Sequence, residues 1–281
     1  QSDTSISKDA FIIANKLGIS YNIAGDYPQA QYYYRQCYLD DIKRMKKKNI
    51  ASDVINGTVL LIELQNYDSA ILLIDTTLLI TGLLARQQSS LYANLAAAYA
   101  GKKQFDSAQI PLQKGFSILD TIKDKSDLDE RYATLYKAKA VIQQSQHEYA
   151  VAIKTWQVCL AYTIKSNENS SFNRYAGKVF IGMGDNFYLL SQFDSALYYY
   201  QKALQTVITV DTLNVLSLPL VKDIYAENTI MDALDGKAKT LTALYGQLHK
   251  QILAQTALDC YNLAFSAENK LSDDKKEKEA E

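Results

Sequence analysis

Residues that interrupt helices are scarce in this sequence. Its 281 residues include only 3 prolines and 11 glycines. Proline removes a backbone donor and glycine raises the entropic cost of a helix, so a chain poor in both can form long helices. A fold of many short strands needs frequent turn residues, and the shortage of them argues against it. The expected fold class is therefore all-α.

The sequence also has no dominant sign of charge and no long apolar run. Lys and Arg number 30 against 31 Asp and Glu, so the chain lacks the basic excess with which proteins bind nucleic-acid phosphates, and no nucleic-acid partner is expected. The most apolar stretch, 70–85, contains Asp75 and is shorter than the roughly 20 residues of a spanning helix, so no membrane span is expected. Hydrophobic residues make up 48% of the chain, which is enough for an extensive core.

Nucleophilic and metal-binding residues are few. Cys37, Cys159 and Cys260 are far apart and form neither a disulfide framework nor a CxxC motif. His147 and His249 are the only histidines, so a cysteine nucleophile lacks a basic partner and a zinc site lacks its ligand spacing. We therefore expect no catalytic residue, no metal and no cofactor. The chain is not expected to be an enzyme, and its cysteines are expected to pack in the core.

What the sequence does contain is a short phrase that occurs five times: an aromatic residue, two variable residues and an alanine. The aromatic residues are Tyr27, Tyr67, Phe105, Tyr149 and Phe193, and the alanines are Ala30, Ala70, Ala108, Ala152 and Ala196. A phrase repeated at long intervals is typical of stacked repeat proteins, which usually bind other molecules rather than catalyse reactions.

The residues after each phrase follow helical spacing. Four residues after the alanine the chain has Tyr34, Ile74, Leu112, Trp156 and Tyr200, and seven after it Cys37, Thr77, Gly115, Cys159 and Ala203. These positions share one face of a helix. The pattern resembles the tetratricopeptide repeat (TPR), in which each repeat is a pair of antiparallel helices.

The TPR resemblance implies a right-handed superhelical α-solenoid of about six helix pairs that occupies residues 1–270 as a single domain. The expected pairs lie near 11–45, 51–86, 89–122, 133–166, 177–208 and, as a divergent pair, 228–271. The charged residues 272–281 are expected to form a flexible tail. The aspartate in three Asp-Ser-Ala copies is expected to be an N-cap, and Pro28 suits a first helical turn.

The last pair carries a narrower resemblance. A linker with Pro219 is followed by Ile-Tyr-Ala-Glu (224–227), Ala-Leu-x-x-Lys-Ala (233–238) and Ala-Leu-x-x-Tyr-x-x-Ala (257–264). This block resembles the repeat region that precedes the caspase-like domain of bacterial CHAT-domain proteins. The resemblance implies a bacterial source and a protease-like domain outside this chain. Similar repeats also precede bacterial histidine kinases, so a sensor or input domain is the alternative.

The chain begins at Gln1 rather than at an initiator methionine, so we expect either a processed protein or an excised part of one. A secreted or periplasmic location after signal removal fits the first case. The compartment and the oligomeric state stay open.

In TPR proteins the first helices of the pairs line a concave binding groove. The resemblance therefore implies a protein or peptide partner, with the protein's own C-terminal domain among the candidates. The lysine and asparagine pair with which chaperone-binding members hold a terminal carboxylate is absent, since Asn15 and Ile19 stand in its place in the first repeat. The expected groove residues are Asn15, Ile19, Asn22, Ile55, Val59, Ile62, Ala93, Ala97, Lys137, Val141, Gln144, Ile181, Asp185 and Tyr188.

Overall fold

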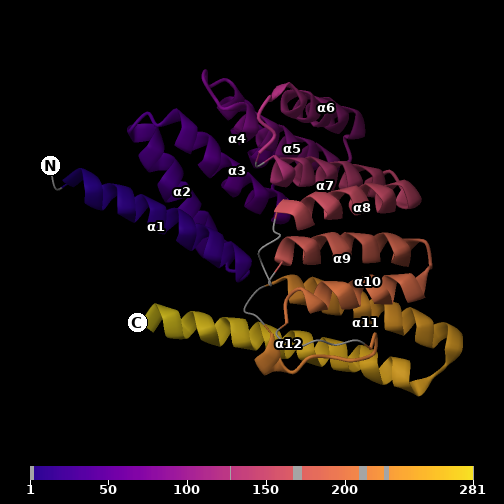
Figure 1. The fold of residues 1–281 in the computed structure, drawn as a ribbon. Coiled ribbons are helices and arrows are strands. Elements are labelled where there is room, and N and C mark those ends of the chain that lie inside the picture. The colour runs from indigo at the N-terminus through magenta and orange to yellow at the C-terminus, as the bar shows by residue number, and fades with distance from the viewer. Residues whose placement is uncertain (1–2, 127, 167–172, 209–213, 225–227, 281) are drawn as a thin grey trace. The chain divides into compact units, whose positions relative to one another are not determined.

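A computed structural model of the chain describes the backbone of residues 3–126, 128–166, 173–208, 214–224 and 228–280, with side chains from residue 13 to residue 270 within these ranges (Figure 1). Over these ranges all regular structure is helical, apart from an isolated antiparallel bridge between Ile208 and Ile224. The helices are α1 (Asp3–Ile23), α2 (Tyr27–Lys43), α3 (Lys47–Glu63), α4 (Tyr67–Leu78), α5 (Ala85–Gly101), α6 (Phe105–Thr121), α7 (Asp129–Ser145), α8 (Tyr149–Ser166), α9 (Arg174–Leu189), α10 (Phe193–Gln205), the 3-10 helix η1 (Val221–Asp223), α11 (Thr229–Leu248) and α12 (Gln251–Ala280).

The chain divides into two compact units, Gln1–Gln146 with α1 to α7 and His147–Glu281 with α8 to α12. In unit 1, each helix packs on the next, and the first helices of successive pairs also pack together, α3 on α5 and α5 on α7. In unit 2, α9 packs on α10 and on α11, and α11 packs on α12. This arrangement of helix pairs confirms the predicted all-α fold.

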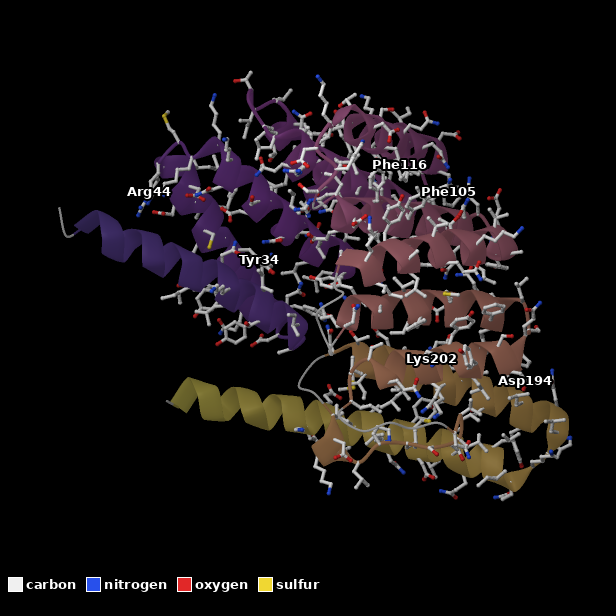
Figure 2. All side chains as sticks on the ribbon, in the orientation of Figure 1. Tyr34, Arg44, Phe105, Phe116, Asp194 and Lys202 are labelled. Atoms are coloured by element: carbon white, nitrogen blue, oxygen red, sulfur yellow. The ribbon has the colours of Figure 1, made fainter. Side chains whose placement is uncertain are left out.

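The repeated alanines are the closest packing points of this fold. Ala30, Ala70, Ala108, Ala152 and Ala196 are each 0% exposed. The large residues four positions later are buried as well: Tyr34 is 5% and Tyr200 2% exposed. Figure 2 labels Tyr34 and Phe105, an aromatic residue of the repeated phrase. Alanine lets the helices approach, and the large side chain fills the space beside the contact. Both positions lie on the shared helix face that the spacing predicted.

The turns inside the pairs share a backbone feature that the sequence did not reveal. The residue five positions before each repeated alanine has a positive φ, between 57° and 78°. Only the first of the five is a glycine, and the others are Gln65, Lys103, His147 and Ser191. Because a left-handed conformation costs a non-glycine residue about 1–2 kcal/mol, the packing of the two helices on either side must stabilise these turns.

The helix starts differ from the prediction for the Asp-Ser-Ala aspartates. Asn66, Gln104 and Gln192 are the N-caps of α4, α6 and α10, so each aspartate lies in the first turn instead. There its charge interacts favourably with the helix dipole. In the first copy, for which no cap was predicted, Asp26 is the N-cap of α2 and accepts a hydrogen bond from the Gln29 backbone N–H at 3.4 Å. Pro28 lies in the first turn, as predicted.

The C-terminus also differs from the prediction. The expected flexible tail from residue 272 is helical, because α12 continues to Ala280. Its lysine, glutamate and alanine residues have high helix propensity and no glycine or proline interrupts them.

The three cysteines are buried and free, as predicted. None of the helices in the described ranges is long and apolar enough to cross a bilayer.

Candidate functional site

The groove residues predicted in unit 1 lie on α1, α3, α5 and α7, the first helices of their pairs. Ile19 and Lys137 are exposed, whereas Ala93 is 1% exposed and belongs to the core. The half-buried members are Asn15, Asn22, Ile55, Val59, Ile62, Ala97, Val141 and Gln144. The surface they form is mostly neutral and only partly open. Ala93 is covered because α5 packs on the first helices at both its sides, α3 and α7.

A buried asparagine fixes two of these first helices together. The Asn94 side-chain amide on α5 donates to the Ile55 carbonyl oxygen at 3.0 Å and to Thr58 Oγ1 at 2.9 Å, both on α3. Each acceptor is backbone or hydroxyl oxygen, so the amide of Asn94 is satisfied inside the core. This joint holds the half-buried faces of α3 and α5 in a fixed register.

In unit 2 the predicted residues Ile181, Asp185 and Tyr188 lie half-buried on α9. The Tyr200 hydroxyl on α10 donates to Asp185 Oδ1 at 2.6 Å. Burial, opposed by this hydrogen bond and assisted by the charge of Asp232 on α11, raises the pKa of Asp185 above its usual value. Asp185 is therefore held at the edge of the core by a tyrosine from the packing face.

The first helix of the divergent pair adds acidic groups beside Asp185. The charges of Asp232 and Asp235 on α11 raise the pKa of the Asp185 carboxyl group, and the charge of Lys239 lowers it. Lys239 Nζ forms an ion pair with Asp235 Oδ2 at 2.5 Å. These residues recur every three or four positions, so they share one face of α11. The sequence argument assigned no groove positions to this divergent helix and therefore missed the acidic face.

A pair of buried carboxyl groups lies where α1, α2 and α3 meet. Asp41 is 0% and Asp53 2% exposed. The Asn15 amide donates to Asp53 Oδ1 at 3.3 Å, and the Asn49 amide donates to Asp41 Oδ1 at 3.4 Å. Both Oδ2 atoms are buried, and neither accepts a hydrogen bond from an N–H or O–H donor of the described residues. One proton held between the two carboxyl groups satisfies them.

The electrostatics of this pair follow from its burial. Burial, and then the charge of Asp41, raise the pKa of Asp53 to about 8. Burial also raises the pKa of Asp41, against the opposing effects of Asn49 and Lys46. Because Asp53 keeps its proton at neutral pH, it donates to the Asp41 carboxylate. The pair thus joins α2 to α3 through a protonated acid, with Asn15 adding α1.

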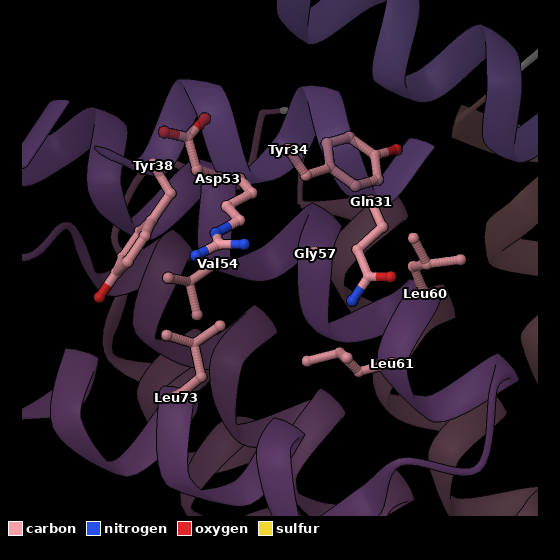
Figure 3. A pocket seen from close by; sticks show the side chains of 10 residues that line it. Gln31, Tyr34, Tyr38, Asp53, Val54, Gly57, Leu60, Leu61 and Leu73 are labelled. Carbon is pink, nitrogen blue, oxygen red and sulfur yellow. The ribbon is translucent and has the colours of Figure 1, made fainter. Parts of the chain in front are cut away.

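A small cavity opens beside this pair, between the second helices α2 and α4 and above α3 (Figure 3). Its volume is about 160 Å³. The lining is mainly apolar and aromatic, with Arg35 and Gln31 as exposed polar members. The lining residues are Gln31, Tyr34, Arg35, Tyr38, Asp53, Val54, Gly57, Leu60, Leu61 and Leu73. None of the predicted groove residues lines it.

The chemistry available at these sites favours binding. Burial raises the pKa of the Cys37 thiol to about 12 and that of Cys260 to about 11, so both are protonated and unreactive near neutral pH. His147 lies in an exposed turn, where its Nδ1 atom is 2.6 Å from the Tyr149 hydroxyl. Among the residues with described side chains, no group of His, Cys, Asp and Glu is arranged to hold a metal ion.

Comparisons with known proteins place the fold. No family model matches the sequence, and no curated protein matches it significantly. Among solved structures, the chain is similar to BtubC from P. vanneervenii, with a TM-score of 0.56 and 14% identity over 89% of this chain and 91% of that one. It is also similar to a putative kinesin light chain with nearly identical TPR-like repeats, with a TM-score of 0.50 and 14% identity over 78% of this chain and 95% of that one, so the fold is that of a TPR-like repeat protein.

The chain is also similar to a Signal Transduction ATPase with Numerous Domains that has a tetratricopeptide repeat sensor, from Pyrococcus horikoshii. The TM-score is 0.64 and the identity 16%, over 90% of this chain. The match spans 34% of the ATPase chain, about a third of its length. These likenesses concern the fold alone.

Proposed function

We propose that the chain is a protein- or peptide-binding TPR-like module, and that its partner lies along the exposed faces of the first helices. The observation that supports this proposal is the difference in burial between the two helices of each pair. The second helices contribute fully buried alanines and large apolar wedges, while first-helix positions such as Ile19, Lys137 and Asp185 stay partly or fully accessible. Accessible positions repeated along the stacked helix pairs of each unit provide a surface of the kind with which repeat proteins bind.

The acidic face of unit 2 refines the partner. Asp185, Asp232 and Asp235 lie together, with Lys239 as the opposing charge. A segment with lysine or arginine side chains complements such a face, and the attraction weakens as salt rises. We therefore propose a basic peptide segment as the ligand of unit 2.

The test is a binding screen of the full chain against peptide pools of equal length that are basic, neutral or acidic. We expect the basic pool to be enriched. Asp232→Lys should reduce its binding, because the exposed Asp232 carboxylate attracts basic peptides and a lysine at this position would repel them. Asp194→Lys, an exposed change on α10, is the control. Equal enrichment of all three pools, or no effect of Asp232→Lys, contradicts the proposal.

We further propose that the module belongs to a larger bacterial protein with a CHAT-type caspase-like domain, and that no catalysis occurs within this chain. The resemblance of the block 224–264 and the raised thiol pKa values support these statements. The partner of the groove would then be a regulator, a substrate or the protease-like domain itself.

The second candidate is a sensor module of a signalling protein such as a histidine kinase. It is favoured by the fold likeness to an ATPase whose TPR part is named a sensor. Sequencing the native gene past Glu281 separates the two candidates. A caspase-like domain supports the first, a kinase domain the second, and a stop codon at this point contradicts both.

A further inference from the structure

The chain itself fills one of the grooves between successive helix pairs. In unit 2, α10 and α12 do not pack directly on each other, although both pack on α11. The segment 214–224 covers the junction of these three helices, where Leu216, Leu218 and Val221 pack against their buried side chains. Residues 217–220 have no regular secondary structure and Pro219 is buried. A non-helical, leucine-rich stretch therefore fits the groove between two second helices.

Two lysines hold this internal segment by its backbone. Lys237 on α11 is 0% exposed and donates to the Gln201 side-chain oxygen on α10 at 2.6 Å and to the Ser217 carbonyl at 2.8 Å. Lys270 on α12 donates to the carbonyl oxygens of Val221 and Ile224 at 3.2 and 2.9 Å. Backbone recognition of this kind positions an extended chain while apolar side chains fill the groove.

Unit 1 has the same groove without an internal occupant. There α2 and α4 do not pack directly on each other, both pack on α3, and the cavity of about 160 Å³ lies between them. The α2–α3 turn at residues 44–46 is too short to cover this groove in the way that segment 214–224 covers the other. Figure 3 shows the aromatic and leucine side chains that border the open space.

The two grooves also correspond in their polar groups. Arg35 and Gln201 each lie five residues after the repeated alanine, on α2 and α10. Gln201 takes part in holding the internal segment through Lys237, whereas Arg35 lines the open cavity and its side chain is exposed. A guanidinium group at the rim of an apolar groove complements a carboxylate and can also donate to backbone carbonyls.

We propose that the α2–α3–α4 groove binds a segment of a partner protein that, like segment 214–224, carries several leucine-type side chains, with an acidic residue beside Arg35. The groove uses Val54, Gly57 and Leu61 of α3, whereas the groove residues predicted on this helix are Ile55, Val59 and Ile62. This site is therefore separate from the peptide-binding faces proposed above and does not depend on them.

The test uses the full chain and a fluorescein-labelled peptide with the sequence of residues 214–224, Asn-Val-Leu-Ser-Leu-Pro-Leu-Val-Lys-Asp-Ile. Its binding is followed by fluorescence anisotropy. The blocking variant is Gly57→Leu, because a Cβ atom at Gly57 meets only Tyr34 Cβ, at 3.9 Å, so the added side chain can occupy the cavity without displacing backbone. Gly57→Ala is the matched control, and circular dichroism checks that both variants fold.

We expect Gly57→Leu to weaken binding at least tenfold and Gly57→Ala to leave it within about twofold, since only leucine fills the space. Arg35→Glu should weaken the same peptide, and replacement of the peptide's aspartate by lysine should restore binding to that variant. Absence of binding to the unchanged chain, or equal binding to Gly57→Leu, overturns the proposal. So does peptide-sensitive dimerisation in sedimentation velocity, because the occupant would then be segment 214–224 of a second copy.

Discussion

Tyr34 in unit 1 and Tyr200 in unit 2 occupy the same position of the repeat but have different neighbours. A Cβ atom added to Gly236 would overlap the Tyr200 ring, and one added to Gly184 would lie 2.8 Å from it. Tyr34 has an equally close neighbour in Gly18, at 2.7 Å, but a Cβ atom at Gly57 would lie 3.9 Å from the tyrosine's Cβ. The tyrosine is thus enclosed on both sides in unit 2 and on one side in unit 1.

The two units also bury charge differently. Unit 1 buries two carboxyl groups, Asp41 and Asp53, that have too few donors between them. Unit 2 buries a single lysine, Lys237, whose ammonium group has two acceptors. Because burial disfavours the charged form of any group, the first arrangement raises carboxyl pKa values and the second lowers that of the lysine. Helix pairs of the same repeat type can therefore bury an acidic pair in one unit and a basic side chain in the other.

The largest expected effect tests the enclosure of the tyrosine. Tyr200→Ala should lower the free energy of unfolding by about 3–5 kcal/mol, because it leaves a cavity and removes the hydrogen bond to Asp185. Tyr34→Ala should cost at least about 1 kcal/mol less, since that ring already borders open space. Urea unfolding followed by circular dichroism measures both, with the exposed Tyr198→Ala as control. Equal losses contradict the comparison.

The next effect concerns the carboxyl pair of unit 1. The folded pKa of Asp53, about 8, is above its unfolded value of 3.8, so the folded state holds one more proton than the unfolded state between pH 3.8 and pH 8. The contribution of this group to stability should then be greatest below pH 4 and fall as the pH rises to about 8. We expect a fall of roughly 3–4 kcal/mol, less than for an isolated carboxyl group because Asp41 shares the proton. Asp53→Asn should flatten this fall.

The measurement for the pair is hydrogen exchange of α2 and α3 between pH 4.5 and 8.5, corrected for intrinsic exchange. Asp40 and the Cys37 thiol also interact with Asp53, and Lys46 interacts with its partner Asp41. Asp75→Asn, an exposed change on α4, is the control. A pH dependence that survives Asp53→Asn would assign it to other groups.

The buried lysine of unit 2 should give the opposite slope. Burial lowers the pKa of Lys237 to about 8 from 10.5, so the folded state holds fewer protons between these values. Stability should rise by about 2–3 kcal/mol from pH 8 to pH 10.5, and be lost again as the pH falls through 8. Lys237→Met should remove this rise, and the exposed Lys250→Met should not.

The single tryptophan makes this effect measurable in unit 2. Trp156 on α8 is 3% exposed, and a Cβ atom at Gly182 of α9 would touch its ring. Its fluorescence during urea unfolding therefore follows this unit. A stability that is flat between pH 8 and pH 10.5 would be incompatible with a buried ammonium group.

The smallest effect compares two glycines. Gly236→Ala should destabilise the protein by about 1–3 kcal/mol, because the methyl group overlaps the Tyr200 ring. Gly57→Ala should be neutral or stabilise by up to about 1 kcal/mol, because alanine is the better helix former and the site has room. Thermal unfolding gives the sign of each change. Destabilisation by Gly57→Ala would mean that the groove of unit 1 is already filled.

The repeat phrase predicted much of this fold because it is a local pattern with a packing cause. The alanines at Ala30 and Ala196, the wedges at Tyr34 and Tyr200 and the burial of the cysteines all follow from helical spacing. The helix boundaries were harder to predict from the sequence. The aspartates of the Asp-Ser-Ala copies lie in the first turn because the helices begin one residue after an asparagine or glutamine, which provides no side-chain cap there.

The candidate sites could be predicted only in part. The resemblance to TPR proteins placed Ile181, Asp185 and Tyr188 on α9, but Asp232 and Asp235 of α11 joined them through helix packing that the divergent sequence did not indicate. No pattern in the sequence indicated the cavity between α2 and α4, because the cavity exists where no other segment packs. Gly57, which lines it, could not be told from the other small residues of the repeats.

By itself the sequence determined the class of fold, the pairing of the helices and the residues that pack where second helices meet their neighbours. These follow from local spacing, since residues three, four and seven apart share a helix face. Only the tertiary structure decided which charged groups are buried and which groove stays open. Asp41 and Asp53 come together from two helices, and Lys237 bonds a residue 36 positions away. Segment 214–224 covers one groove, whereas the short α2–α3 turn leaves a cavity in its counterpart in unit 1.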